Sequence, residues 1–350
     1  MRIRFLTSTP LDIQRGSGTY VGIQVLARGL QALGHSVAIE TPRLRLPVFT
    51  AQRLLFNRGL RPSGEFDLTV GFDLDGYRIA GDGHVAALKG VIADELGFER
   101  GLTRFTMGIQ ARRERAHVHA AARVVVTSRY SARRACELYG LSELPAVVPE
   151  PLELDAWKRL LADHPASSRR FTVLSVGRFY RRKRIPLLLR AAAQLRARIP
   201  QLEVRIVGDG PCNRPWRRLA GELRLEDTVT WLGDVSRPAL AGEYNRAHLF
   251  CLPSVQEGFG IVLLEAMAAG NAIVAARAAA IPEVAPHALL VEPESAAALA
   301  EAILELYLSA AGRARQSQAS AEWVRQFDAP LVARRFLAAA TGERATGTPA

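Results

Sequence analysis

Hydrophobic and polar residues follow two alternating patterns along this chain. Short apolar runs end in Gly, Asp or Ser, and between them lie longer stretches in which apolar residues recur every three or four positions. The first pattern is typical of buried strands and the second of amphipathic helices. Their regular alternation predicts βα units with parallel sheets.

The predicted elements extend along most of the chain. Strands are expected at 2–8, 37–39, 66–72, 91–93, 124–127, 171–176, 203–207, 228–232, 249–252, 272–276 and 289–291. Helices are expected at 21–33, 100–122, 186–198, 214–224, 238–246, 261–269, 295–309 and 321–340. The connection at 42–64 and the charged stretch at 153–170 carry no clear pattern.

Two domains are predicted, because 350 residues exceed one ordinary hydrophobic core. The stretch around His164 and Pro165 separates two series of βα units, so we expect Rossmann-like domains at 1–165 and 166–327. The last helical region is interrupted at Asp328–Pro330, where the chain can cross back. We therefore expect the helix at 328–350 to pack on the first domain.

One stretch, 249–285, combines a strand, a glycine-bearing turn, a helix and a second strand. The start of such a helix is an anion site, because its free N–H groups and positive dipole end face the turn. Glu257 and Glu265 bracket this turn, and carboxylates suit that place if they accept hydrogen bonds from hydroxyl groups. A nucleotide sugar, with phosphates between two sets of hydroxyls, meets both requirements.

Glycines recur directly after the strands of the second half, at Gly177, Gly208, Gly210, Gly233 and Gly258. These positions share the ligand-binding edge of an open parallel sheet. Arg178 and Lys183 lie on the first of these loops, where two cations can clamp a diphosphate. The alternative is that they are ordinary surface cations. In the first half, Gly16 and Gly18 resemble a dinucleotide loop with altered spacing, and a plain tight turn is an equal alternative.

Composition limits the class of protein. The sequence is 49% hydrophobic and 23% charged, which is typical of globular proteins, and it has no apolar run long enough for a membrane span. No apolar segment precedes Asp12, so we expect no signal peptide. The three cysteines Cys136, Cys212 and Cys251 lack metal-ligand spacing, and their small number suits a reducing cytoplasm.

The chain is basic, with a formal net charge of +12 and a pI of about 10.4. This charge favours phosphate-rich partners, but an arginine- and alanine-rich composition also results from GC-rich coding, and both explanations stay open. Aromatic residues are not interleaved with the basic ones, so a nucleic-acid partner is not expected. The arginines of the helix at 100–122 form either a solvated face or a patch for an anionic membrane.

Several motifs in the second half resemble one family. These are SVGRFYRRKRIPLLLRA, VRIVGDGP, VTWLGDV and PSVQEGFGIVLLEAMAAGNAIVA followed by IPEV. They resemble the retaining glycosyltransferases of family 4, or glycosyl transferases group 1, and the N-terminal GSGTYVGIQVLARGLQALGHSVAI is similar to the glycine loop and first helix of that family. The resemblance implies a GT-B fold, in which two Rossmann-like domains with parallel sheets face a central cleft. The first would bind the acceptor and the second the nucleotide sugar.

By position, the resemblance implies a donor site in the second domain. Arg178 and Lys183 would bind the diphosphate and support the leaving group, and Glu257 would contact sugar hydroxyls near the anomeric carbon. Glu265 would accept hydrogen bonds from the ribose. The remaining donor-binding positions act through the main chain: Gly258, Phe259, Gly260, Gly208, Gly210, Gly16 and Gly18.

The chain departs from the family pattern on the acceptor side. Many members carry a histidine at the end of the strand that is predicted here at 91–93, where this sequence has Asp94 and Glu95. This acidic pair either replaces the histidine, which makes Asp94 a candidate catalytic residue, or caps a helix. The nearest histidine is His84, and the turn near the domain boundary reads Pro149–Pro151 instead of Pro-Asn-Gly.

The expected activity is transfer of a sugar, as by a hexosyltransferase, from a nucleotide sugar to an acceptor hydroxyl with retention of configuration. The resemblance implies no metal and no cofactor; Asp73 and Asp75 match an Asp-x-Asp metal motif but lie in the wrong half. The acceptor is a lipid-linked molecule, a glycan or a small metabolite, and the location is cytoplasmic, with or without contact with the inner membrane face. The alternatives are a non-catalytic nucleotide-sugar-binding protein and a GT-B epimerase that uses Asp94, Glu95 and His84.

Overall fold

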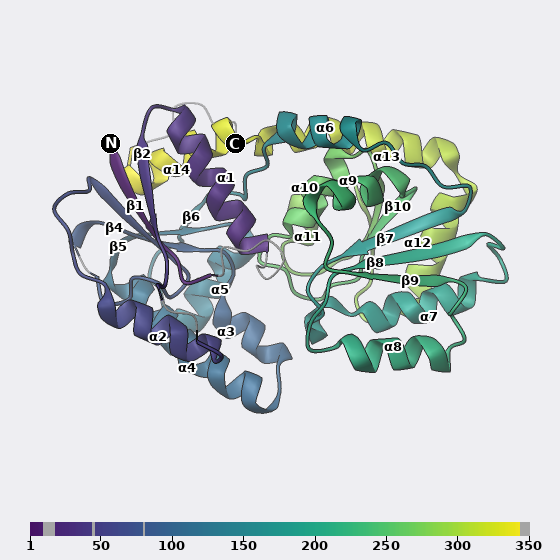
Figure 1. The fold of residues 1–350 in the computed structure, drawn as a ribbon, viewed down its shortest axis with the longest axis horizontal. Helices are drawn as coiled ribbons and strands as arrows, with labels where there is room; N and C mark the ends of the chain where they lie inside the picture. The colour runs from purple at the N-terminus through teal and green to yellow at the C-terminus, as the bar shows by residue number, and fades with distance from the viewer. Residues whose placement is uncertain (10–17, 44–45, 80, 344–350) are drawn as a thin grey trace. The chain divides into compact units, whose positions relative to one another are not determined.

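The computed structural model describes residues 1–9, 18–43, 46–79 and 81–343. The chain forms two compact units: unit 1 is Met1–Pro151 with Phe327–Ala350, and unit 2 is Leu152–Gln326 (Figure 1). In the described residues each unit contains a six-stranded sheet in which all neighbouring strands are parallel. This confirms the prediction of two Rossmann-like domains.

In unit 1 the strand order is β2-β1-β3-β4-β5-β6. The strands are β1 Arg2–Leu6, β2 Ser36–Glu40, β3 Leu68–Phe72, β4 Gly81–Leu88, β5 Ala121–Val126 and β6 Ala146–Val147. The α-helices are α1 Gly18–Ala32, α2 Phe49–Gly59, α3 Ile92–Glu95, α4 Gly101–Ala120, α5 Arg129–Tyr139 and α14 Ala329–Thr341, and a 3₁₀ turn, η1, covers Leu96–Phe98.

The core of unit 1 joins the first and last parts of the chain. Phe5 of β1 and Phe72 of β3 meet edge to face, with ring centroids 4.9 Å apart. Phe336 of α14 packs on Phe5 from the C-terminal end of the chain. At Gly29 of α1 an added Cβ would lie 3.0 Å from the Ala329 carbonyl, so the two helices pack backbone against backbone. The last helix therefore lies on unit 1 (Figure 1).

In unit 2 the strand order is β12-β11-β10-β7-β8-β9. The strands are β7 Phe171–Val176, β8 Leu202–Val207, β9 Val229–Gly233, β10 Leu249–Leu252, β11 Ala272–Ala276 and β12 Leu289–Val291. The α-helices are α6 Leu154–Asp163, α7 Ile185–Leu195, α8 Asn213–Glu222, α9 Arg237–Arg246, α10 Ile261–Ala268, α11 Ile281–Val284, α12 Ala296–Leu308 and α13 Ala310–Trp323. Two 3₁₀ turns are η2 Arg181–Lys183 and η3 Val324–Phe327.

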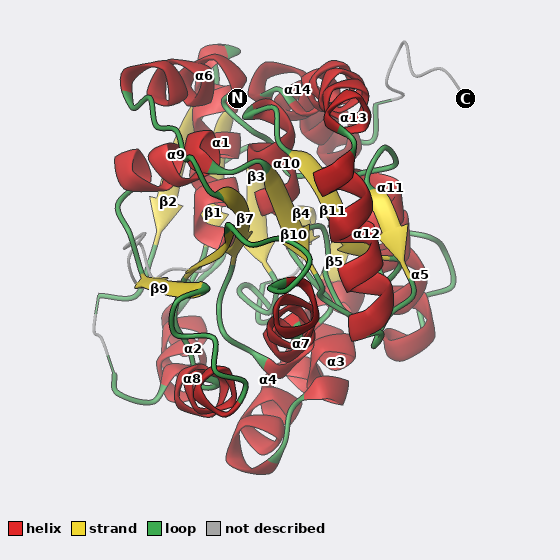
Figure 2. Cartoon of the chain, turned by 90° about the vertical axis from the view of Figure 1, so that its right-hand side faces the viewer, coloured by secondary structure: helices red, strands yellow, loops and turns green. Residues whose placement is uncertain are grey.

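Helices α7 and α12 pack side by side on the sheet of unit 2 (Figure 2). Leu188 and Leu189 of α7 and Ile303 of α12 are fully or almost fully buried in one apolar cluster with Val173 and Val204 of the sheet. The chain order reverses between β7 and β10, and ligands of open α/β sheets bind at the carboxyl ends of strands beside such a reversal. The loops after β7 and β10 are therefore the expected ligand-binding region of unit 2.

Among the helices of the described chain, none has the length and apolar character to cross a membrane.

The strand expected at 91–93 is wrong. The strand of this region is β4, which ends before it, and Ile92 instead begins α3. The first N–H of α3, from Ile92, donates to a Glu114 carboxylate oxygen at 2.8 Å, which is a helix-start contact. A short apolar run is compatible with either a strand or a buried helix start, and sequence periodicity does not separate them. As a result His84 lies inside β4 rather than before a strand.

The division between the units falls at Pro151–Leu152, earlier than the expected position after 165. The difference is α6, which lies in the stretch where no element was predicted. Trp157 of α6 packs against Tyr244 with ring centroids 5.6 Å apart, and its indole N–H donates to the Glu265 carbonyl at 3.1 Å. Asn245 also donates to the Leu161 carbonyl at 2.7 Å. These contacts make α6 the first helix of unit 2.

Candidate functional site

The loop after β7 is held rigidly at the sheet edge. Phe179 is buried, and its ring packs on Trp216 and Trp231 with centroids 5.1 and 5.8 Å away. Its N–H donates to the Asp209 carbonyl at 2.9 Å, and its own carbonyl accepts from the Cys212 N–H at 2.9 Å. The loop that carries the two predicted cations, on either side of Phe179, is therefore anchored to the loop after β8.

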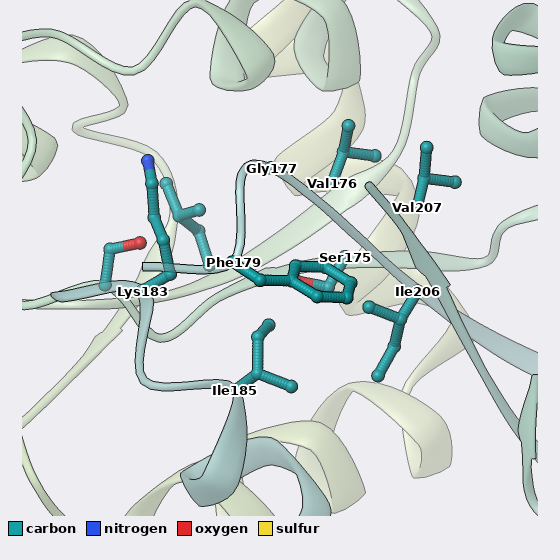
Figure 3. Close-up of a pocket in the computed structure, with 10 residues that line it drawn as sticks. Ser175, Val176, Gly177, Phe179, Lys183, Ile185, Ile206 and Val207 are labelled. Atoms are coloured by element: carbon teal, nitrogen blue, oxygen red, sulfur yellow. The ribbon is translucent and has the colours of Figure 1, made fainter. Parts of the chain in front are cut away.

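Lys183 and Glu257 form an ion pair between the loops after β7 and β10. Lys183 Nζ lies 2.6 Å from Glu257 Oε1, and the side chains are 14% and 7% exposed. The Val255 N–H donates to the Arg182 carbonyl at 2.9 Å, which joins the same two loops through the main chain. Figure 3 shows Lys183 extending beside Gly177, where a small cavity is lined by the ends of β7, β8 and β10. The sequence prediction that these residues share one edge is consistent with this geometry.

Glu257 is ionised in this setting. Burial opposes its ionisation, but the charges of Lys183 and Arg182 outweigh that effect and hold the pKa of Glu257 below its ordinary value. The site therefore presents a buried carboxylate and an ammonium group side by side at neutral pH. A carboxylate of this kind accepts hydrogen bonds, and the Lys183 ammonium donates one to it.

The turn that follows Glu257 exposes the start of α10. Gly260 adopts φ +92° directly before the helix, a left-handed conformation that favours glycine. Phe259 is buried and fixes the turn. The Leu263 N–H donates to the Gly260 carbonyl at 2.9 Å, whereas the N–H groups of Ile261 and Val262 have no partner among the described residues and can meet an anion. This local structure is compatible with the predicted anion site, which stays a prediction.

Arg178 lies on the same edge, 3.3 Å from Asp234 in the loop after β9, with both side chains about one-third exposed.

Gly208 and Gly210, after β8, lie where the main chains of neighbouring loops pack closely. An added Cβ on Gly208 would lie 2.1 Å from the Gly177 carbonyl oxygen, and one on Gly210 would lie 2.8 Å from the Phe179 nitrogen. These glycines let the strand-end loops approach each other; contact of a base with them stays a prediction.

Glu265 is almost completely buried within α10 and has partners that the sequence did not suggest. Arg237, the first residue of α9, pairs with its Oε1, and the Tyr244 hydroxyl donates to its Oε2 at 3.0 Å. Arg237 also stacks on Trp157, with Cζ 4.2 Å from the ring centroid. One feature of the sequence could have indicated this ion pair. Arg237 stands at the start of a predicted helix, where a cation is unfavourable unless another group stabilises it.

The site residues that the sequence predicts in unit 1 are Gly16, Gly18 and Asp94. Gly16 lies outside the described residues, and Gly18 is the first residue of α1. Asp94 is buried on α3, where it accepts hydrogen bonds from the Tyr130 hydroxyl and the Arg134 Nε, each at 2.8 Å. Its carboxylate therefore joins α3 to α5.

His84 is buried in β4, and its Nε2 lies 2.9 Å from Nε2 of His117 on α4. Burial lowers the pKa of His84 to about 4 and that of His117 to about 3, so both are neutral at pH 7.

Asp75 is also buried; it accepts hydrogen bonds from the N–H and hydroxyl of Ser8, both at 2.6 Å, and from Asn57 at 2.8 Å. In the part of the chain that the structure describes, no three His, Cys, Asp or Glu side chains gather as metal ligands.

Comparisons with known proteins show which family and which structures the chain resembles. Residues 158–323 match the family Glycosyl transferases group 1. The chain is 36% identical over 166 residues to a D-inositol 3-phosphate glycosyltransferase of Pseudarthrobacter chlorophenolicus, covering 45% of this chain and 40% of that protein. It is 28% identical over 217 residues to a GDP-mannose-dependent alpha-(1-6)-phosphatidylinositol monomannoside mannosyltransferase of Mycobacterium tuberculosis, covering 57% and 56%. The chain thus spans about half the length of the curated relatives it matches.

Solved structures show the fold of the whole chain. Sucrose-phosphate synthase from Thermosynechococcus elongatus superposes with a TM-score of 0.78 at 21% identity, covering 96% of this chain and 97% of that one. WaaG, a glycosyltransferase involved in lipopolysaccharide biosynthesis, superposes with a TM-score of 0.75 at 16% identity, covering 97% and 100%. The chain has the GT-B fold of these glycosyltransferases. The match of residues 158–323 to the glycosyl transferases group 1 confirms the resemblance seen in the sequence.

Proposed function

We propose that this protein transfers a sugar from a nucleotide-diphosphate sugar to an acceptor hydroxyl, with retention of configuration and without a bound metal. The observation that carries the proposal is the Lys183–Glu257 pair, held at 2.6 Å beside the uncapped start of α10. Cations, a helix start and an ionised carboxylate at the reversal of a parallel sheet suit a ligand that combines phosphates with hydroxyls.

The chemistry follows from the charges of the reaction. As the bond between the anomeric carbon and the diphosphate oxygen breaks, negative charge grows on the diphosphate and positive charge on the sugar. In this proposal the Lys183 ammonium and the first N–H groups of α10 stabilise the first charge, and the Glu257 carboxylate stabilises the second. The acceptor oxygen bonds to the anomeric carbon from the same face, and its proton passes to the departing diphosphate. Groups fixed before the reaction stabilise such charges with little reorganisation.

A ligand screen followed by an assay tests the proposal. UDP-, GDP- and ADP-sugars are compared by thermal shift, and we expect one nucleotide class to raise the unfolding temperature, because bound ligand stabilises the native state. The stabilising donor is then incubated with candidate acceptors and analysed by mass spectrometry for product and anomeric configuration. Absence of stabilisation by every nucleotide sugar would overturn the proposal.

The described residues favour neither alternative over sugar transfer. An epimerase needs acid and base groups that reach its ligand; of the three candidates, His84 and Asp94 are buried with partners from neighbouring elements, and only Glu95 is half-buried. A protein that only binds nucleotide sugars would stabilise with ligand but release no nucleoside diphosphate. Measurement of nucleoside diphosphate release and of epimer formation therefore separates the three activities.

We further propose a lipid-linked acceptor and contact of unit 1 with an anionic membrane, from the cytoplasmic side. Two curated relatives act, by name, on inositol phosphate or on a phosphatidylinositol monomannoside. At the start of α4, Leu102 is 77% and Phe105 67% exposed, and Arg100 and Arg104 are exposed beside them. Apolar side chains next to arginines are typical of surfaces that enter anionic lipid. The free cysteines of the described chain fit a reducing compartment.

Vesicle sedimentation tests the membrane contact. We expect the protein to bind vesicles that contain phosphatidylglycerol and not vesicles of phosphatidylcholine alone. A Leu102→Asp, Phe105→Asp variant should lose most of this binding, whereas Leu308→Asp, at a site 74% exposed in unit 2, should keep it. Equal binding of both variants would contradict the assignment of this surface.

A further inference from the structure

Glu265 lies where three helices of unit 2 meet. Its carboxylate on α10 receives Arg237 and Tyr244 from α9, and its main-chain carbonyl accepts the indole N–H of Trp157 from α6 at 3.1 Å. The Glu265 side chain is 4% exposed, and the Arg237 side chain 27%. The carboxylate is therefore held in a single orientation from two sides.

The position of Arg237 is not explained by the stability of its own helix. It is the first residue of α9, at the positive end of the helix dipole, where a cation is unfavourable. The N-cap of this helix is already supplied by Ser236, whose hydroxyl accepts from the Ala239 N–H. The guanidinium is instead stabilised from outside, by the Glu265 carboxylate and by the face of Trp157, 4.2 Å from its Cζ. We therefore attribute the position of Arg237 to its interaction with Glu265 and not to the stability of α9.

The hydrogen bonds that the Glu265 carboxylate accepts within the described residues leave acceptor positions for a ligand. An ionised carboxylate has about four acceptor positions, two on each oxygen. Arg237 uses one on Oε1 and Tyr244 one on Oε2. Within the described residues this leaves one acceptor position on each oxygen. Two neighbouring hydroxyl groups, as on a ribose, match one remaining acceptor on each of two adjacent oxygens.

We propose that Arg237 is a positioning residue: together with Trp157 it fixes the Glu265 carboxylate so that both of its oxygens accept from the two hydroxyls of a donor ribose. This inference rests on the proposed function, because it assumes a nucleotide ligand. Arg237 itself stays paired with Glu265 when the ligand binds, since separating them would leave a buried carboxylate without a cation.

The test measures how strongly the protein distinguishes ribose from dideoxyribose. UDP and GDP, and their 2′,3′-dideoxy forms, are titrated by calorimetry into the full-length protein. The native protein should bind the ribose form of its preferred nucleotide at least about tenfold more tightly, because hydrogen bonds to a charged group are lost with the hydroxyls. In Arg237→Met this ratio should fall below about threefold, whereas affinity for inorganic diphosphate should stay unchanged.

Two further variants separate positioning from general stability. Arg237→Lys keeps the charge but not the planar guanidinium, so it should give an intermediate ratio, and it serves as the reporter if Arg237→Met does not fold. Arg205→Met removes another arginine that pairs with α9, through Glu243 at 2.5 Å. This control should lower the unfolding temperature and leave the ratio at its native value.

The outcomes separate this inference from the proposed function. If neither nucleotide binds the native protein, the proposed function is overturned and the inference with it. If the native protein binds ribose and dideoxyribose forms equally, or if Arg237→Met and Arg237→Lys both keep the native ratio, the role of Arg237 is overturned while nucleotide binding stands.

Discussion

Replacing Lys183 with methionine tests both roles of the Lys183–Glu257 pair. Methionine keeps most of the apolar stem of Lys183 and removes its charge. Glu257, 7% exposed, is then left in the protein interior without its ammonium partner. The loop after β7 remains anchored by Phe179, so the backbone of the site should persist.

The stability cost follows from burial. Removing one partner of a fully buried ion pair costs about 3–5 kcal/mol. Here the Lys183 side chain is 14% exposed and Arg182 still lowers the pKa of Glu257, so we expect a smaller cost, about 2 kcal/mol. For a unit of this size that corresponds to a fall of about 4–8 °C in unfolding temperature. The double variant Lys183→Met, Glu257→Gln leaves no buried charge and should regain about half of the loss.

Activity should respond differently from stability. Loss of one fixed donor to a developing negative charge lowers kcat by about 100- to 1,000-fold, and Glu257→Gln restores none of it. Calorimetry gives the unfolding temperatures, and release of nucleoside diphosphate gives the rates. A Lys183→Met variant with kcat within about threefold of the native value, under saturating donor, would refute the assignment of Lys183 to the leaving group.

Three other predictions follow from the same geometry. Gly208→Ala places a Cβ 2.1 Å from the Gly177 carbonyl oxygen, at a residue with φ +120°. We expect thermal scans to show that this variant lowers the unfolding free energy by more than about 2 kcal/mol. The control Gly59→Ala has open space around its Cβ, so its unfolding free energy should stay within about 0.5 kcal/mol of the native value. His84 and His117 have folded pKa values of about 4 and about 3, below the ordinary 6.5, so the unfolded chain binds more protons and stability falls as pH drops from 6.5 towards 4. Each histidine contributes about 1.4 kcal/mol per pH unit in that range, and His84→Gln should remove its own share of this slope in pH-dependent thermal scans. Treatment with EDTA should leave sugar transfer unchanged; a loss that Mg²⁺ or Mn²⁺ restores would contradict the metal-free mechanism.

The sequence predicted unit 2 closely because its strands are short, mainly apolar runs separated by polar or glycine-bearing turns. The strands expected at 171–176, 272–276 and 289–291 coincide with β7, β11 and β12. The missed helix α6 has apolar residues at Leu154, Trp157 and Leu161, a helical spacing that its charged neighbours and the following Pro165 obscured. Local pattern therefore predicts elements whose burial is nearly complete and fails where burial depends on a distant partner.

The same limit applies to the candidate site. Lys183 and Glu257 were found because each lies on a glycine-bearing loop directly after a strand, and parallel strands bring such loops to one edge. The partners of Glu265 were not found, because Arg237 and Tyr244 lie on another helix, 28 and 21 residues away in sequence, and Trp157 lies 108 residues away. Contacts between helices of this kind leave no periodic signal in either segment.

The histidine-to-acidic change near the end of β4 is explained best as part of the interior of unit 1. Asp94 receives the Tyr130 hydroxyl and the Arg134 guanidinium, so its oxygens already hold α5 against α3. His84 donates from Nε2 to His117, because His117 Nδ1 must donate to the Asp73 carbonyl and its neutral ring can then only accept at Nε2. The Nε2 proton of His84 and the Nδ1 proton of His117 are thus used within unit 1, and the Asp94 carboxylate is used as an acceptor from α5. In unit 2, by contrast, the N–H groups of Ile261 and Val262 at the start of α10 have no hydrogen-bond partner among the described residues, and this supports the proposal that the donor binds there.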